Sequence, residues 1–193
     1  MELIAVDHPL VAHKVRLLRD VTTDSPTFRR LVDELMTLLA YEATREVRVE
    51  DVEVRTPITT TIGPRLSHPL PLVVPILRAG LGMLDGVLDM IPSAKISVVG
   101  LYRNEETLEP VPYFDKFVDS LDERIALIID PMLATGGSLI ATIDMLKRLG
   151  AKQVRALVLV AAPEGIAAVS EAHPDVDVFT AAIDSHLNEI GYI

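Results

Sequence analysis

The chain has 193 residues, of which 49% are hydrophobic and 24% charged, and it contains no cysteine. This composition excludes a disordered chain, and the lack of cysteine excludes disulfides and thiolate metal sites. The formal net charge of −10 disfavours binding to the phosphate backbones of nucleic acids. No stretch approaches the roughly 20 apolar residues of a membrane span, and no basic region precedes an apolar run at the N-terminus. We therefore expect a cytoplasmic protein that binds neither membranes nor nucleic acids.

The first predicted element in chain order is a helix over about residues 27–44. Its apolar side chains recur at helical spacing on one stripe: Phe28, Leu31, Leu35, Leu38 and Leu39. Ser25 and Pro26 stand directly before it, where they suit the N-cap and the first helical position. The sequence therefore predicts an N-terminal helical region over about residues 8–45, packed on the rest of the chain.

Short runs rich in β-branched residues follow, and we expect each to form a strand. These runs cover residues 72–77, 95–100, 124–130, 154–161 and 176–183. Helical segments lie between most of them, over residues 81–90, 138–149 and 164–172. Continuous apolar strands that alternate with helices indicate an α/β fold with a parallel sheet flanked by helices on both faces. Ligands of such sheets bind at the carboxyl ends of the strands, so functional residues are expected there.

The loop after the strand 124–130 has the composition of a phosphate-binding loop. Thr135, Gly136, Gly137 and Ser138 lead directly into a predicted helix. Adjacent glycines let backbone N–H groups approach a ligand, the hydroxyls add donors, and a helix N-terminus favours an anion. Asp130, at the strand end, is suited to accept hydrogen bonds from sugar hydroxyls. The same residues also fit a plain strand-turn-helix junction in which Ser138 caps the helix, but no Gly-Lys-Ser/Thr of a Walker-type NTPase occurs.

An arginine follows the strand 72–77 and interrupts an otherwise apolar stretch. Arg78 looks buried in the sequence, and a buried guanidinium needs an anionic partner, for which phosphate oxygens are well suited. An internal ion pair with Asp85 explains the same pattern. The glycines at 80, 82 and 86 miss the spacing of the dinucleotide fingerprint, which disfavours a nucleotide-dependent oxidoreductase.

A long polar connection runs from Gly100 to about Lys116, and its length predicts a mobile lid or binding loop. Arg103 in this connection is suited to close over a bound anion, although a solvated arginine balanced by Glu105 and Glu106 also fits. Two arginines and a glycine-hydroxyl loop at separate strand ends imply a ligand with phosphates at separated places. A phosphorylated sugar with a second, leaving phosphate group meets this description, and Mg²⁺ held mainly by substrate oxygens would accompany it.

Residues 130–138 resemble the phosphoribosyl diphosphate (PRPP) motif of the type I phosphoribosyltransferases. Most branches of that superfamily carry two adjacent acids here, whereas Asp130-Pro131 resembles the uracil phosphoribosyltransferase branch. The resemblance extends over essentially the whole chain, through residues 8–14, 39–44, 75–83, 101–107, 160–165, 172–177 and 188–193. It implies a single type I phosphoribosyltransferase-like domain over residues 1–193. The implied reaction is transfer of a phosphoribosyl group from PRPP to uracil, which gives UMP and diphosphate in pyrimidine salvage.

The resemblance also implies roles for individual residues. Asp130 is expected to engage the ribose hydroxyls, residues 134–138 the 5′-phosphate, and Arg78 and Arg103 the diphosphate. The predicted PRPP-binding residues are Arg78, Arg103, Asp130, Pro131, Met132, Leu133, Ala134, Thr135, Gly136, Gly137 and Ser138. No histidine or carboxylate stands out as a general base, so catalysis is expected to rest on positioning and electrostatics, with Arg78, Arg103 and Asp130 as the electrostatic groups.

Family members are Mg²⁺-dependent and form dimers or higher homo-oligomers, and some are activated by GTP, so the resemblance implies these properties too. In the family, the chain continues past the position of Ile193 into a Pro/Gly/Asp-containing segment that reads the base edge. We therefore expect Ile193 to contact uracil and the remaining base contacts to lie beyond it. If that base-binding segment is missing, the alternative is a non-catalytic or regulatory protein of the same fold that binds PRPP or nucleotides without turnover.

Overall fold

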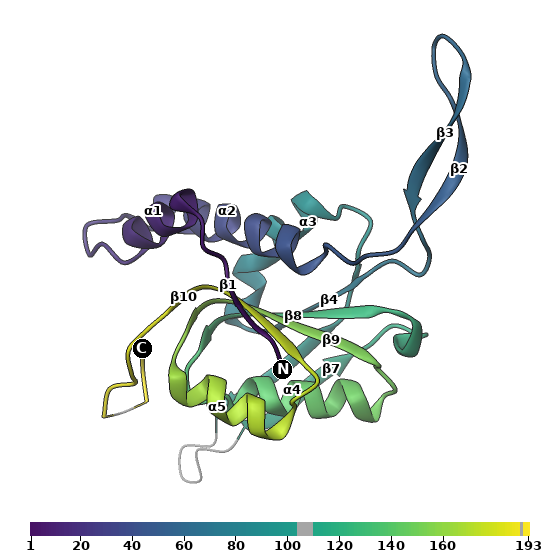
Figure 1. Cartoon of the computed structure of the whole chain (residues 1–193). Coiled ribbons are helices and arrows are strands. Elements are labelled where there is room, and N and C mark those ends of the chain that lie inside the picture. Colours follow the sequence, from purple (N-terminus) through teal and green to yellow (C-terminus); the bar gives the residue numbers. More distant parts are fainter. Residues whose placement is uncertain (104–109, 190) are drawn as a thin grey trace.

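The computed structural model describes residues 1–103, 110–189 and 191–193. Its centre is an eight-stranded sheet with helices on both faces (Figure 1). Its strands are β1 (Leu3–Ala5), β4 (Leu72–Leu77), β5 (Lys95–Ile96), β6 (Val98–Arg103), β7 (Pro110–Lys116), β8 (Ile125–Leu133), β9 (Gln153–Ala161) and β10 (Asp177–Ile183). They follow the order β1-β10-β9-β8-β4-β6-β7, with β5 paired to β4. Only the β6–β7 pair among the described strands of this sheet is antiparallel, which confirms the predicted α/β fold with a mostly parallel sheet.

Helices cover the sheet on its two sides, as Figure 1 shows. The α-helices are α1 (Pro9–Leu18), α2 (Ser25–Ala43), α3 (Leu84–Met90), α4 (Gly137–Arg148) and α5 (Pro163–Ala172). Two 3-10 helices, η1 (Ala79–Met83) and η2 (Leu121–Glu123), lie in connections. Helices α1, α2 and α3 lie on one face of the sheet, and α4 and α5 lie on the other (Figure 1). No helix in the described part of the chain combines the length and the apolar character needed to cross a membrane.

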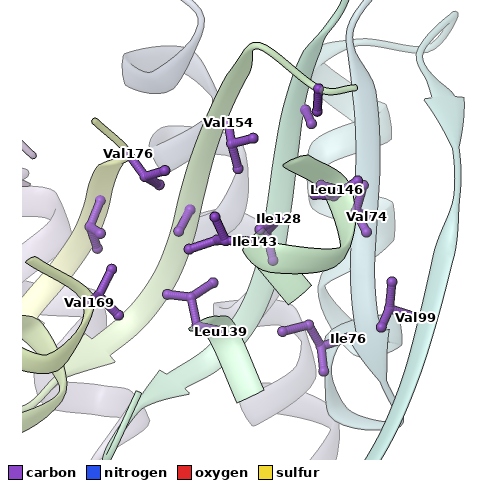
Figure 2. Close-up of a cluster of buried hydrophobic side chains, with 14 of the residues drawn as sticks. Val74, Ile76, Val99, Ile128, Leu139, Ile143, Leu146, Val154, Val169 and Val176 are labelled. Carbon is purple, nitrogen blue, oxygen red and sulfur yellow. The ribbon is translucent and has the colours of Figure 1, made fainter. Parts of the chain in front are cut away.

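The core consists of two layers, one on each face of the sheet, because successive strand residues point to opposite sides. Val74, Ile76 and Ile128 face α4 and α5, and Figure 2 shows them with Leu139, Ile143, Leu146 and Val169 of these helices. Their neighbours Val73, Leu127 and Ile129 face α2 and pack with its side chains. The continuous apolar runs of the sequence are thus explained by burial on both faces.

Helix α2 begins two residues before the predicted start. Its N-cap is Asp24, not Ser25, because the Asp24 carboxylate accepts a hydrogen bond of 2.9 Å from the backbone N–H of Thr27. Leu31, Leu35 and Leu39 of the predicted stripe are buried, but Phe28 is 41% exposed. The buried face is instead completed by further apolar residues of the helix: Val32, Met36, Ala40 and Ala43.

Two other segments differ from the sequence prediction. Residues 95–100 form two short strands, β5 and β6, which pair with successive parts of β4. The predicted helix 81–90 is a 3-10 turn followed by the short helix α3.

Two strands without a sequence prediction form a separate antiparallel hairpin that projects from the body of the molecule (Figure 1). They are β2 (Val49–Arg55) and β3 (Thr60–Leu66), which pair from Val49 opposite Leu66 to Arg55 opposite Thr60. Their side chains are mostly exposed on both sides of the ribbon. For this reason they lack the apolar run or the strict alternation that identifies a strand in a sequence.

Candidate functional site

The predicted site residues gather at the carboxyl edge of the parallel strands. Strand β4 lies between β8 and β6, with Pro75 opposite Ile129 and Leu77 opposite Gly100. The segment that follows β4 carries Arg78, and Asp130 lies in β8, three residues before its end. The topology therefore brings these two sequence motifs, which are about fifty residues apart, to adjacent strand ends, where α/β sheets bind ligands.

Asp130 lies within β8, because the strand continues to Leu133 instead of ending at the acid. Its side chain is half-buried. Burial of the carboxyl raises the pKa of Asp130 from 3.8 to about 7, since the charged form loses hydration there. Near neutral pH this carboxyl is therefore poised between its protonated and ionised forms.

Residues 130–138 are called the phosphate loop from here on. Gly136 has φ 86° and is the N-cap of α4, with no side-chain capping bond, so a left-handed conformation that favours glycine starts the helix. This geometry contradicts the alternative in which Ser138 caps the helix, because Ser138 already lies inside α4. The side chains of Thr135 and Ser138 are exposed, beside the first N–H groups of α4. The loop thus presents hydroxyls and a helix N-terminus to the same space.

The other members of the phosphate loop differ in exposure. Pro131, Ala134 and Gly137 are half-buried, and Met132 is 50% exposed. The side chain of Leu133 is only 2% exposed and packs in the core on the α4 side of the sheet. Leu133 therefore supports the loop from inside the protein and offers no side chain to a ligand.

Arg78 directly follows β4, after a cis peptide bond between Leu77 and Arg78. The prediction that it is buried is wrong: its side chain is exposed, because the apolar strand ends at Leu77 and Arg78 stands at the turn into η1. Within the described ranges Arg78 makes no ion pair, with Asp85 or with any other acid. The internal ion pair considered from the sequence is therefore not formed, and the guanidinium is available for a ligand.

A cavity of about 850 Å³ lies beside Arg78. Its wall includes Tyr102 and Tyr113, whose ring centroids are 6.3 Å apart. No role was predicted for either tyrosine, although Tyr102 lies in the stretch 101–107 that carries the resemblance; Tyr113 falls in the predicted loop. Gly100 makes room for Tyr113, since a Cβ at Gly100 would lie 2.7 Å from the tyrosine ring.

The predicted lid over residues 100–116 is in large part a strand pair. Residues 110–116 form β7, which pairs antiparallel with β6, so that Arg103 lies opposite Pro110. The physical reason is that β6 is apolar enough to be a sheet strand, and β7 covers its outer side. The backbone of Arg103 ends β6 at the same sheet edge as Arg78. Glu105 and Glu106 lie outside the described residues.

The C-terminal segment, defined as residues 184–189 and 191–193, contacts the phosphate loop. A Cβ at Gly191 would lie 3.5 Å from Cγ2 of Thr135. The backbone N–H of Asn188 donates to the carbonyl of Tyr192, and the backbone N–H of Gly191 donates to the carbonyl of Asn188, so this segment folds into a turn. Ile193 is half-buried and packs against the core layer on the α2 side. Gly191, two residues before Ile193, therefore lies next to Thr135 of the phosphate loop.

Comparison with known proteins agrees with this arrangement. The family model described as uracil phosphoribosyltransferase matches residues 5–193. The structure of the AQ2163 protein from Aquifex aeolicus is similar over 99% of this chain and 91% of that chain, with 38% identity and a TM-score of 0.93.

Two structures with lower identity share the fold. The purine phosphoribosyltransferase from Pyrococcus horikoshii is 20% identical, with a TM-score of 0.54 over 80% of this chain and 87% of that chain. The APRTase from Giardia lamblia, complexed with 9-deazaadenine, is 17% identical, with a TM-score of 0.60 over 91% of this chain and 98% of that chain. Together with the family match, the fold supports phosphoribosyl transfer to a nucleobase. The chain belongs to the uracil phosphoribosyltransferase family.

Proposed function

We propose that residues 1–193 act as a phosphoribosyltransferase domain that transfers the phosphoribosyl group of PRPP to uracil and releases diphosphate. The observation that carries this proposal is the meeting of two loops at adjacent strand ends. One loop offers an exposed arginine without an acidic partner in the described chain, and the other offers a glycine-started helix N-terminus near a half-buried acid. The arginine and the helix N-terminus each suit a phosphate, so together they suit a substrate with phosphates at both ends of a sugar.

Each end of PRPP has a matching group in the proposed site. The first N–H groups of α4, with the hydroxyls of Thr135 and Ser138, suit the 5′-phosphate. Asp130 suits the ribose hydroxyls, for which it must be ionised in order to act only as an acceptor. Arg78, on the wall of the 850 Å³ cavity, suits the diphosphate, because its guanidinium binds two phosphate oxygens at once. Arg103 is proposed to approach the diphosphate from the end of β6.

Mg²⁺ fits this site as an ion carried by the substrate. In the part of the chain that the structure describes, no group of three or more His, Asp or Glu side chains is arranged to hold a metal. Mg²⁺ is commonly bound by one or two carboxylates, waters and substrate phosphates, and here Asp130 would be the carboxylate. When bound, the ion would offset the negative charge that develops on the leaving diphosphate.

The proposed reaction depends on charge placement and orientation. The bond between the ribose C1′ and the diphosphate oxygen breaks, and the bonding electrons leave with diphosphate. A uracil nitrogen forms the new bond to C1′, and the proton of this N–H group passes to the leaving diphosphate or to water. Positive charge builds on the sugar and negative charge on the leaving group. Arg78 stabilises the latter, while the phosphate loop holds the ribose in line for attack. The described site residues contribute by binding and orienting the substrate.

Uracil is proposed to bind near the phosphate loop and the C-terminal segment, which meet where Gly191 approaches Thr135. Ile193 follows two residues later and is the proposed base contact. By resemblance to the family, the protein is further proposed to be a cytoplasmic homodimer or larger homo-oligomer, with GTP as an effector. Sedimentation analysis with and without GTP, together with rate measurements at both conditions, tests these two properties.

Base selectivity provides the test of the proposed function. The protein is incubated with Mg²⁺, PRPP and an equimolar mixture of labelled uracil, orotate and hypoxanthine, and the nucleotides are separated. The proposal predicts UMP as the main product. Another nucleotide as the main product contradicts the assignment of uracil, and PRPP binding without any nucleotide supports a regulatory protein of the same fold instead.

A further inference from the structure

The start of α5 lies where the phosphate loop and the C-terminal segment meet. Ala162, just before the helix, donates its backbone N–H to the carbonyl of Leu133 at 2.9 Å. Asp184, at the beginning of the C-terminal segment, donates its backbone N–H to Ala161 at 2.9 Å. The two segments that form the proposed site are therefore attached to the same short stretch of chain, at its junction with α5.

Gly165, in the first turn of α5, lets the phosphate loop approach the helix backbone. A Cβ at Gly165 would overlap the carbonyl oxygen of Ala134 and lie 3.0 Å from its carbonyl carbon. The contact is reciprocal, since a Cβ at Gly136 would lie 3.2 Å from the carbonyl oxygen of Gly165 and 3.3 Å from Cβ of Ala168. Apart from the Ala168 Cβ, these are backbone atoms, which cannot move aside as a flexible side chain can. The position of the phosphate loop is therefore set by the lack of a side chain at Gly165.

Glu164, the preceding residue, holds the C-terminal segment. Its Oε1 accepts the backbone N–H of Leu187 at 3.0 Å. This hydrogen bond lowers the pKa of the Glu164 carboxyl below its usual range, so the acceptor is ionised at neutral pH. Four residues beyond Leu187, Gly191 lies against Thr135 of the phosphate loop. The bond to Glu164 thus fixes the segment close to the point at which it meets the loop.

We propose that Gly165 and Glu164 are positioning residues of the proposed reaction. Gly165 sets the phosphate loop at the distance from α5 that PRPP binding requires, and Glu164 sets the C-terminal segment at the distance that base binding requires. Neither residue touches the substrates. The expected changes in KM rest on the proposed function. Both contacts also have effects that can be measured without turnover, on hydrogen exchange and on PRPP binding.

The Gly165→Ala variant tests the first contact. The added methyl displaces the phosphate loop, so KM for PRPP should rise about tenfold or more while KM for uracil changes less than about threefold. Gly82→Ala is the matched control, because the same methyl at Gly82 meets nothing within 4 Å. Should Gly165→Ala fold poorly, Ala168→Val presses on Gly136 from the side-chain direction and should raise KM for PRPP in the same way.

The Glu164→Ala variant tests the second contact. Loss of the acceptor should raise KM for uracil about fivefold or more with KM for PRPP nearly unchanged. Glu164→Gln retains an acceptor oxygen and should restore KM for uracil to within about twofold of the wild-type value. Glu171→Ala removes an exposed carboxylate from the other end of the same helix and should behave as wild type.

Two further measurements separate the inference from the proposed function. Hydrogen exchange at the Leu187 amide should become at least about tenfold faster in Glu164→Ala but not in Glu171→Ala. Calorimetric binding of PRPP with Mg²⁺ should weaken about tenfold in Gly165→Ala or Ala168→Val but not in Gly82→Ala. If wild-type protein forms no UMP, the proposed function fails. Leu187 exchange and PRPP affinity still test whether Glu164 and Gly165 hold the two segments in place. Unchanged Leu187 exchange and unchanged PRPP affinity would overturn the inference.

Discussion

A Cβ at Gly80 would lie 2.5 Å from the carbonyl oxygen of Ile129. The turn that follows β4 therefore rests directly on the backbone of β8, one residue before Asp130. Since Arg78 precedes Gly80 by two residues, this contact fixes the distance between the arginine and the acid. The two proposed substrate contacts are thus coupled through the backbone of neighbouring strands and not through side chains.

Substitution of Gly80 by alanine should disturb this coupling. The methyl group would force η1 away from β8, and we expect a loss of about 1–3 kcal/mol in the free energy of unfolding. A shift of Arg78 by about an ångström should also lower kcat/KM for PRPP about a hundredfold. Urea unfolding and steady-state kinetics measure the two effects, with Gly82→Ala as the control. Full activity in Gly80→Ala would show that the spacing of Arg78 and Asp130 does not matter.

The raised pKa of Asp130 predicts a pH dependence of activity. The ionised carboxylate is the form that accepts hydrogen bonds from ribose hydroxyls, so kcat/KM for PRPP should rise with pH through about 7. The profile should be compared in the wild type and in Asp130→Asn, which should be much less active and should lack this step. A profile that is flat from about pH 6 to pH 8 in the wild type argues against the role of Asp130.

The same group predicts a pH dependence of stability. Its pKa is about 7 in the folded protein and near 3.8 in the unfolded chain, so the folded state binds the proton more tightly. The favourable contribution is complete below the unfolded value and is lost as the pH rises through about 7. Asp130→Asn should therefore gain the most stability over the wild type at about pH 8 and little near pH 4.

The gain should reach at most about 4 kcal/mol, because one pKa unit equals about 1.4 kcal/mol. For a chain of this size, each kcal/mol corresponds to roughly 2–4 °C in Tm. Thermal unfolding of both proteins across this pH range measures the difference. A gain in Tm that does not grow between about pH 5 and pH 8 would mean that burial does not raise the pKa of Asp130.

Arg78 should matter for activity and not for stability. Its exposed side chain makes no ion pair within the described residues, so Arg78→Ala should change Tm by no more than about 2 °C. The variant should lose about a hundredfold in kcat/KM for PRPP, and Arg78→Lys should recover only part of it, because an ammonium cannot bind two oxygens in a fork. An equal loss of stability and activity would instead assign Arg78 a structural role.

Arg103, at the end of β6, allows a second test of charge stabilisation at the leaving diphosphate. Removal of a preorganised donor to the leaving diphosphate should lower turnover of Arg103→Ala by on the order of 10²–10³. Single-turnover measurements at saturating PRPP isolate the chemical step from binding. A change below about threefold would remove Arg103 from the proposed mechanism.

The buried part of the fold was predictable from the sequence because burial leaves a simple pattern. The strand 72–77 has the same bounds in the prediction and in the structure, since all its residues are apolar and the first five are fully buried. The turn into α4 was predictable as well, because adjacent glycines permit the left-handed backbone that Gly136 adopts at the helix start. Phosphate binding by this loop stays a prediction.

Other parts depend on tertiary contacts that leave no local pattern. Strand β7 contains Pro110 and Pro112, which suit an edge strand but look like a loop in the sequence. The exposure of Arg78 depends on the residue at which β4 ends. The close approach of Ala134 to Gly165 joins segments that are about thirty residues apart in the sequence. These contacts determine the geometry of the site, but they leave no recognisable pattern in the neighbouring sequence.

Transfer of label in a single turnover is the most direct test of phosphoribosyl transfer at this edge of the sheet. Enzyme in molar excess is mixed with labelled uracil, PRPP and Mg²⁺, and the label is followed by chromatography. The account predicts conversion of uracil to UMP in the wild type and, under the same conditions, a rate lower by on the order of a hundredfold in Arg78→Ala. Label that remains in uracil, with PRPP bound to a folded wild-type protein, would contradict it.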